Sequence, residues 1–176
     1  MLVQIGQRAQ HEHLVDLLAE CHTRIRRFLS LATALADDRS TPESEAHSVA
    51  GQVRRYFTSA FPHHVADEEQ LITPRLAGTS ANLDSALARV HADHAHHADA
   101  IALLVGVCTA IERNPSSLAI YASELRHAAA LATRCLLPHL ELEERELFPA
   151  VRALPVDVQS EIRAGMRQQR DADFAK

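Results

Sequence analysis

The sequence contains no tryptophan, and only 4% of its 176 residues are aromatic. With few aromatic rings on which bases could stack and a formal net charge of −5, the chain lacks the usual features of a nucleic-acid binder. Its three cysteines stand far apart and form no CxxC pair, which excludes a disulfide framework and is typical of reduced thiols. We therefore expect a cytoplasmic protein that binds no nucleic acid.

Long apolar runs are also missing. No uninterrupted run approaches the ~18–20 residues of a membrane-spanning helix, and the N-terminal residues lack the basic start and apolar core of a secretory signal. We therefore expect no membrane association, and a monomer or a homodimer. The length suits one domain, and hydrophobic residues, at 47% of the chain, suffice for a core.

Glycine and proline are scarce, at five and seven residues, and alternating strand-like patterns are almost absent. Good helix formers dominate, and apolar residues recur every three or four positions, as in amphipathic helices. The pattern predicts an all-α fold, an up-down-up-down four-helix bundle. We expect helices over about residues 10–36, 44–76 and 82–113, a fourth from the turn at 114–117 to about 148, and a tail helix over 157–170.

We expect residues 1–155 to form the bundle domain and residues 156–176 to form the C-terminal tail. Pro62 and Pro138 fall inside the second and fourth predicted helices. Because proline removes a helical hydrogen bond and clashes with the preceding turn, both helices are predicted to kink there.

The most unusual feature of the composition is its 12 histidines. Some of them lie in an internal repeat with an offset of 75 residues, in which His64 and Glu68 correspond to His139 and Glu143. Residues four apart on a helix project from the same face, so the imidazole and carboxylate of each pair can reach one cation. One such pair is usually an ordinary surface pair, but two pairs at equivalent places of a repeat favour a metal site.

The other two helices should then supply one histidine each. His22 lies on the apolar stripe of the first helix. The third helix offers four candidates, His91, His94, His96 and His97. Counted from the turns at ~1.5 Å per residue, His94 lies within about one helical turn of the level of the other histidines. The 75-residue offset instead maps His22 onto His97. Level counting favours His94, with His97 as its rival.

Together these residues make a mixed nitrogen and oxygen site for two first-row metal ions. The predicted ligands are His22, His64, Glu68, His94, His139 and Glu143. If both carboxylates bridge, each ion takes two imidazole nitrogens and two carboxylate oxygens. An oxo or hydroxo bridge would add a fifth ligand and leave one position open for a small molecule. The absence of thiolates from this set argues against a structural zinc site or an iron–sulfur cluster.

Four segments carry a resemblance to a known family: residues 19–29, 55–69, 92–94 and 139–149. Together they resemble the hemerythrin-like, HHE cation-binding proteins over about residues 14–150, and residues 161–170 resemble the tail common in bacterial members. The resemblance implies a non-haem di-iron site with two iron ions at the six residues named above. It also implies a function among O2 binding, nitric-oxide response, iron–sulfur repair, iron sensing and peroxide breakdown.

One departure from the family pattern bears on function. Oxygen-carrying hemerythrins have two histidines four residues apart on the third helix, whereas Ala98 stands four residues after His94. This difference argues against reversible O2 transport. We therefore expect a di-iron protein that reacts with or binds peroxide, O2 or nitric oxide, peroxide decomposition being the enzymatic activity considered. The alternatives are an iron- or oxygen-sensing module without turnover, and a helical interaction domain whose histidines bind no metal.

The remaining polar residues near the motifs receive simpler interpretations. Glu69 and Glu144 are expected to pair with arginines, and Tyr56 to lie in the core. His91, His96 and His97 could form a polar entrance, or His97 could be a seventh ligand. Histidines 11, 13, 47 and 127 are expected at the surface, and His63 there or beside the ligands.

Overall fold

The computed structural model describes residues 13–174, and within that range the chain forms helices and no strand. The predicted all-α class is therefore confirmed. The first rod is α1 (Leu14–Asp37), and the second comprises α2 (Glu43–Arg55), α3 (Phe61–Asp67) and α4 (Thr73–Leu76), joined by the π-helical turns η1 (Tyr56–Ala60) and η2 (Glu68–Ile72). The third rod is α5 (Ala81–Arg113). After the 3-10 turn η3 (Pro115–Ser117), the fourth comprises α6 (Leu118–Leu142), the π-helical turn η4 (Glu143–Leu147) and α7 (Phe148–Ala153), and α8 (Val156–Phe174) follows.

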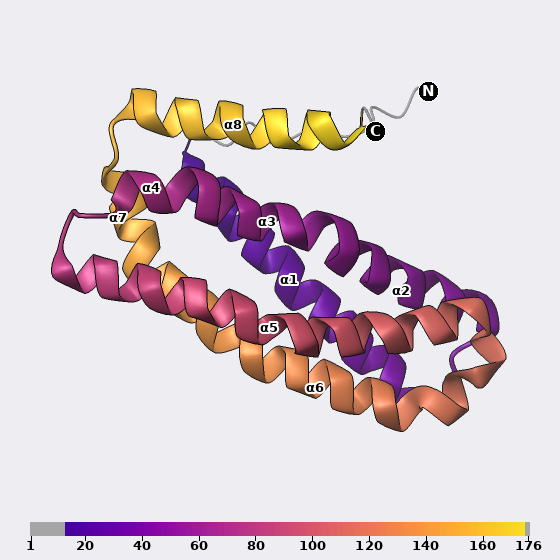
Figure 1. Ribbon diagram of the computed structural model, residues 1–176. Coiled ribbons are helices and arrows are strands. Elements are labelled where there is room, and N and C mark those ends of the chain that lie inside the picture. Colours follow the sequence, from indigo (N-terminus) through magenta and orange to yellow (C-terminus); the bar gives the residue numbers. More distant parts are fainter. Residues whose placement is uncertain (1–12, 175–176) are drawn as a thin grey trace.

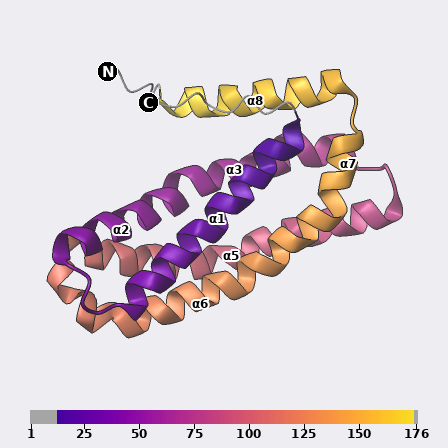
Figure 2. The ribbon, with the colours of Figure 1, turned by 180° about the vertical axis from the view of Figure 1, so that it is seen from behind.

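The four rods pack as a bundle in which α1 and α5 each contact both α2 and α6. Figures 1 and 2 show the chain turning back on itself at each connection between rods. The predicted helix ends agree with the structure to within a residue or two, except that the first helix begins only at Leu14, the fourth rod continues to Ala153 and the tail helix continues to Phe174. Residues 10–12 of the first predicted helix lie outside the described residues.

The turn before α5 shows why this long helix begins where it does. Gly78 has a φ of +79°, in the left-handed region that glycine adopts without a steric penalty. Two residues later, the Ser80 hydroxyl accepts a hydrogen bond from the backbone N–H of Leu83 at 3.2 Å. This N-cap satisfies one of the amide groups that the first helical turn leaves free.

Each π-helical turn is followed by a proline at the start of the next helical segment, namely Pro62, Pro74 and Pro149. Proline cannot donate the helical hydrogen bond, and the wider turn lets the rod continue past it. The predicted interruption at Pro62 therefore coincides with η1, whereas α6 continues through Pro138 as one helix. Such π-helical segments inside α-helices are frequent at functional sites.

The buried apolar residues form two clusters along the length of the bundle. On α1, residues 25–36 contribute to one cluster and residues 14–18 to the other. On α5, residues 104–111 and 83–90 divide in the same way. Between the clusters, at mid-length of the rods, lies a layer of buried histidines and glutamates. The core packing thus sets the height of this polar layer.

The tail helix α8 packs on α1, α3 and η2 (Figure 1). Ile162 and Met166 are buried in the second apolar cluster. Farther along α8, the Arg170 guanidinium donates to the buried carboxylate of Asp67 with an N–O distance of 2.6 Å. The domain boundary between residues 155 and 156 stays a prediction.

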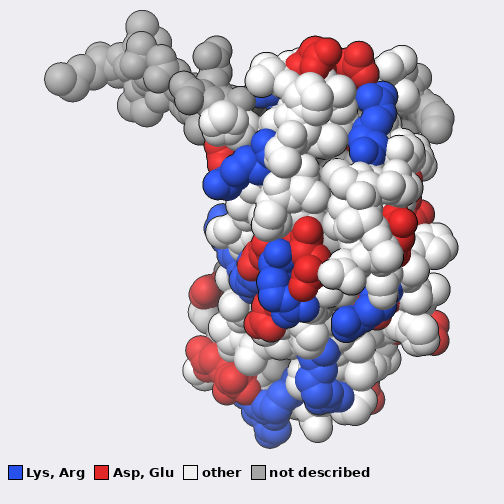
Figure 3. All heavy atoms as spheres, turned by 90° about the vertical axis from the view of Figure 1, so that its left-hand side faces the viewer, with Lys and Arg blue, Asp and Glu red and all other residues white. Residues whose placement is uncertain are grey.

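Figure 3 shows one end of the bundle, where acidic and basic side chains occur in small mixed groups and much of the surface carries neither. Among the described helices, α5 is long and apolar enough to cross a membrane by length and composition, and 33% of its apolar window is buried. Length and composition alone are weak evidence for a membrane span, because the core helix of a helical bundle meets the same criteria.

Candidate metal centre

The polar layer between the two apolar clusters contains all six predicted ligands. His22 comes from α1, His94 from α5, and the two His-x-x-x-Glu pairs from the second and fourth rods. Glu68 and Glu143 are the first residues of the π-helical turns η2 and η4. The six side chains are almost completely buried, and His94, at 6%, is the most exposed of them. The structure thus brings the predicted residues together, whereas metal ligation by them stays a prediction.

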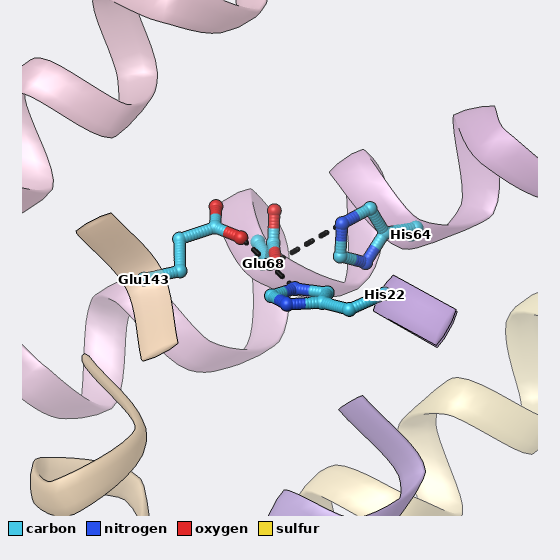
Figure 4. A group of neighbouring side chains, drawn as sticks. All are labelled: His22, His64, Glu68 and Glu143. Atoms are coloured by element: carbon cyan, nitrogen blue, oxygen red, sulfur yellow. Dashed lines mark ion pairs between the residues drawn. The ribbon is translucent and has the colours of Figure 1, made fainter. Parts of the chain in front are cut away.

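Each glutamate lies between two imidazoles. The Glu143 carboxylate lies 3.1 Å from Nε2 of His22 and 2.9 Å from Nε2 of His139. The Glu68 carboxylate lies 3.4 Å from Nε2 of His64 and 3.3 Å from Nε2 of His94. Figure 4 shows His22, His64 and both glutamates turned toward a common space.

Two groups of four residues offer donor atoms that all lie within 4.8 Å of one another. Each group joins two histidines to the same two glutamates: the first contains His22 and His64, and the second contains His94 and His139. Sharing of Glu68 and Glu143 by both groups is the arrangement that two cations bridged by carboxylates require.

Many donor atoms in this layer are buried and have no hydrogen-bond partner. They are Nε2 of His22 and of His94, both ring nitrogens of His64, Oε2 of Glu68 and both carboxylate oxygens of Glu143. Buried polar atoms are nearly always hydrogen-bonded, because leaving them unpaired costs free energy. Converging nitrogens and oxygens without hydrogen-bond geometry fit a cation site, so the donor set suits a pair of metal ions.

A second carboxylate holds one imidazole in each group. Nδ1 of His22 donates to Glu144 at 2.8 Å, and Nδ1 of His94 donates to Glu69 at 3.0 Å. These bonds turn the Nε2 atoms toward Glu143 and Glu68, as carboxylates behind metal-binding histidines commonly do. In η2 and in η4, two consecutive glutamates therefore reach the layer.

The predicted pairing of these second glutamates with arginines is confirmed for Glu144, which accepts hydrogen bonds from Arg26 at 2.8 and 3.1 Å. For Glu69 the prediction is wrong. Its carboxylate accepts hydrogen bonds from His91 and His94, both at 3.0 Å. Glu69 faces the third rod, where these histidines replace the expected arginine.

The two halves of the repeat contact each other in the layer. The second-half pair Glu143–Glu144 contacts His22 of the first half, and the first-half pair Glu68–Glu69 contacts His94 of the second. His94 therefore takes the place that His22 has in the first half, in agreement with level counting. His97, onto which the 75-residue offset maps His22, belongs to neither group of four.

His97 is buried rather than part of a polar entrance. Only 3% of its surface is exposed, its ring centroid lies 4.6 Å from that of His139, and its Nδ1 has no hydrogen-bond partner. Together with Asp93 and His139 it forms a third group of neighbouring donor atoms. By contrast, the side chain of His91 is 75% exposed.

Burial shapes the protonation of the layer. It lowers the pKa of His64 to about 3, which keeps this imidazole in the neutral form that binds metals. Burial, with the Glu143 carboxylate close by, raises the pKa of Glu68 well above its usual range. Although burial opposes it, the imidazoles of His139 and His22 hold the pKa of Glu143 below its usual range. A bound cation would offset the repulsion between the two carboxylates.

The other predictions for single residues can be compared with the structure. Tyr56 is buried, as expected, and its hydroxyl donates to the backbone carbonyl of Cys21 at 3.4 Å. Burial raises the pKa of the Cys21 thiol, which disfavours its reactive thiolate form. Histidines 13, 47, 96 and 127 are exposed, His63 is half-buried, and His11 lies outside the described residues.

No curated protein matches the chain significantly. The family model described as the hemerythrin HHE cation binding domain matches residues 13–151. This range covers most of the chain and includes every residue of the polar layer. The chain therefore belongs to the hemerythrin HHE cation-binding domain family.

Proposed function

We propose that this protein is a non-haem di-iron protein that reacts with small oxidants, with peroxide as the first candidate and O2 and nitric oxide as further ligands. His22 and His64 would hold one iron, and His94 and His139 the other. Glu68 and Glu143 would bridge them, together with an oxo or hydroxo group. The observation that carries this proposal is the pair of four-residue groups that share both glutamates.

The chemistry of the donors supports iron. Imidazole and carboxylate together suit first-row ions such as iron, and the site has no thiolate that would favour an iron–sulfur cluster. When bound, the irons would supply one-electron redox chemistry and polarise an oxygen ligand.

Access to the layer favours a small ligand. A surface pocket of about 300 Å³ between η2 and α5 is lined by Glu69, Gln70, Thr73, Val90, His91 and His94. It opens beside His94, the most exposed of the six predicted ligands. The remaining five lie deeper, between the apolar clusters. Because Glu68 and Glu143 are buried, this arrangement suits peroxide or a diatomic molecule.

The two groups of four supply equal sets of donors, with two imidazoles each. Ala98, one helical turn after His94, adds no further imidazole, so the second iron would have as few protein ligands as the first. The second iron would therefore have fewer protein ligands than in oxygen-carrying hemerythrins, which have two histidines four residues apart on the third helix. This lower coordination favours reaction with an oxidant over reversible O2 carriage.

The proposal is tested by measuring metal content, absorption spectra and peroxide consumption of the full-length protein. We expect about two irons per chain and peroxide consumption faster than by the same concentration of free iron. Glu68→Ala should abolish the excess, because it removes one of the two shared carboxylates. His47→Ala is the matched control, since His47 is exposed and bonds only the backbone carbonyl of Glu112 among its described partners.

Two results would contradict the proposal in different ways. An iron content well below one per chain after anaerobic reconstitution would show that the layer does not hold a di-iron centre. A stable, reversible O2 adduct without peroxide turnover would identify a binding or sensing module.

A further inference from the structure

The two halves of the bundle differ at two positions of the first and third rods beside the layer. When His94 is matched to His22, Asp93 corresponds to Cys21, and His97 corresponds to Ile25. Ile25 is fully buried and belongs to the first apolar cluster. The second half places an imidazole there, with a buried Nδ1 that has no hydrogen-bond partner. A buried, unpaired nitrogen in place of an isoleucine calls for a ligand.

The surroundings of His97 supply the other donors. Asp93 lies one helical turn before it on α5, and Oδ2 of Asp93 lies 3.5 Å from Nδ1 of His139. Donor atoms of Asp93, His97 and His139 all lie within 4.8 Å of one another. Two imidazoles and one carboxylate form a common set for divalent first-row ions, with positions left for water.

This group lies between solvent and the predicted di-iron centre. The side chain of Asp93 is 39% exposed, whereas His97 and His139 are buried. His139 belongs to both sites: its Nε2 lies 2.9 Å from the Glu143 carboxylate, while its Nδ1 faces Asp93. A cation that arrives at Asp93 is therefore one imidazole ring away from the inner layer.

We propose that Asp93, His97 and Nδ1 of His139 form an entry site, which takes a divalent first-row cation from solvent before it moves to the inner layer. Because His139 serves both sites, an ion held at its Nε2 would repel a cation at its Nδ1, one imidazole ring away, and would displace that outer cation. The site therefore serves loading and adds no permanent third ion. The inference rests on the proposed metal centre.

The test follows the uptake of Co²⁺ by the metal-free, full-length protein under anaerobic conditions, with the cobalt absorption bands as the readout. Loss of a supporting group costs a metal site about tenfold or more in affinity; because uptake would pass through the entry site, His97→Ile should slow it by about the same factor. The final occupancy should stay at two ions. Isoleucine reproduces the residue of the first half, so it removes the nitrogen without leaving a cavity. Asp93→Asn should slow uptake as well.

His96→Ala is the matched control, because His96 is the next residue on α5 but is exposed and bonds the Ala92 carbonyl. Its uptake should equal that of the unmodified protein. Uptake by His97→Ile at the unmodified rate would overturn the entry site. A final occupancy of one ion in His97→Ile would make His97 a permanent ligand and would also overturn it. Failure of the unmodified protein to take up two ions would refute the proposed metal centre itself.

Discussion

Replacement of the carboxylates behind His22 and His94 provides a quantitative test of the metal centre. Glu144 and Glu69 each accept a hydrogen bond from the Nδ1 atom of one of these histidines, at 2.8 and 3.0 Å, and each has a side chain that is 37% exposed. Glu144→Gln and Glu69→Gln keep an oxygen that can accept the bond but remove the negative charge. Because both glutamates are partly exposed, we expect both variants to fold.

The magnitude follows from the role of the lost charge. A carboxylate makes the imidazole behind it a better donor and fixes its orientation, and its loss typically lowers metal affinity by about tenfold or more. A tenfold change corresponds to about 1.4 kcal/mol of binding free energy. Because the two halves place these carboxylates in the same way, the two variants should lose similar amounts, each mainly from the ion that its histidine holds.

The assay is competition for Fe²⁺ or Co²⁺ with a chelator of known affinity, under anaerobic conditions. Glu141→Gln is the control, since Glu141 lies near the end of α6 but is exposed. Affinities of both variants within twofold of the unmodified protein would refute the idea that these carboxylates hold metal-binding imidazoles.

Three further predictions follow from the same structure. His64→Ala and His139→Ala should each strongly lower the metal content measured after anaerobic reconstitution, because each removes one of the two imidazoles of an ion, while His47→Ala should not. Burial lowers the pKa of His64 in the folded, metal-free protein to about 3, so at pH 5 only the unfolded chain takes up this proton, which costs about 2 kcal/mol of stability. The raised pKa of Glu68 acts in the opposite direction, so the effect of His64 is measured against His64→Gln: between pH 7 and 5 the unmodified metal-free protein should lose about 2 kcal/mol more stability than this variant. An equal pH dependence of the two proteins would contradict this. Arg170→Ala should lower the free energy of unfolding by about 1–2 kcal/mol, because it leaves the buried Asp67 carboxylate without its ion-pair partner. The loss stays modest because the Arg170 guanidinium is 37% exposed and solvent weakens the pair. The measurement is chemical denaturation, in which adding Asp67→Asn to Arg170→Ala should recover part of the loss.

Sequence periodicity predicted the helical fold well because the apolar stripes of each rod are local features. The bounds of the second rod, for example, follow from the turn residues at either end. The π-helical turns were not predicted. In η2 the wider turn goes with a contact of the tertiary structure, namely that Glu68 and Glu69, adjacent in sequence, both reach His94 on another rod. The only signal in the sequence was the proline that follows each turn.

The positions of the candidate ligands could be predicted because the repeat placed two pairs at one level. On the third helix the 75-residue offset pointed to His97, whereas the structure places His94 in the group of four with Glu68. The connections between rods differ in length, so helices that correspond in the repeat need not share one register. Asp93 was missed as a partner of His97, because its role depends on His139 from another rod.

The separation of the core into two apolar clusters has a consequence for how the protein unfolds. Without a cation, the layer of imidazoles and carboxylates is the cross-section with the least cohesion, so amide hydrogens on either side of it can exchange in separate opening events. Bound ions would join four distant segments of the chain at mid-length, as crosslinks do, and would raise stability with the logarithm of the free cation concentration relative to its Kd. The same cross-section would then set both the affinity for metal and the cooperativity of the whole bundle.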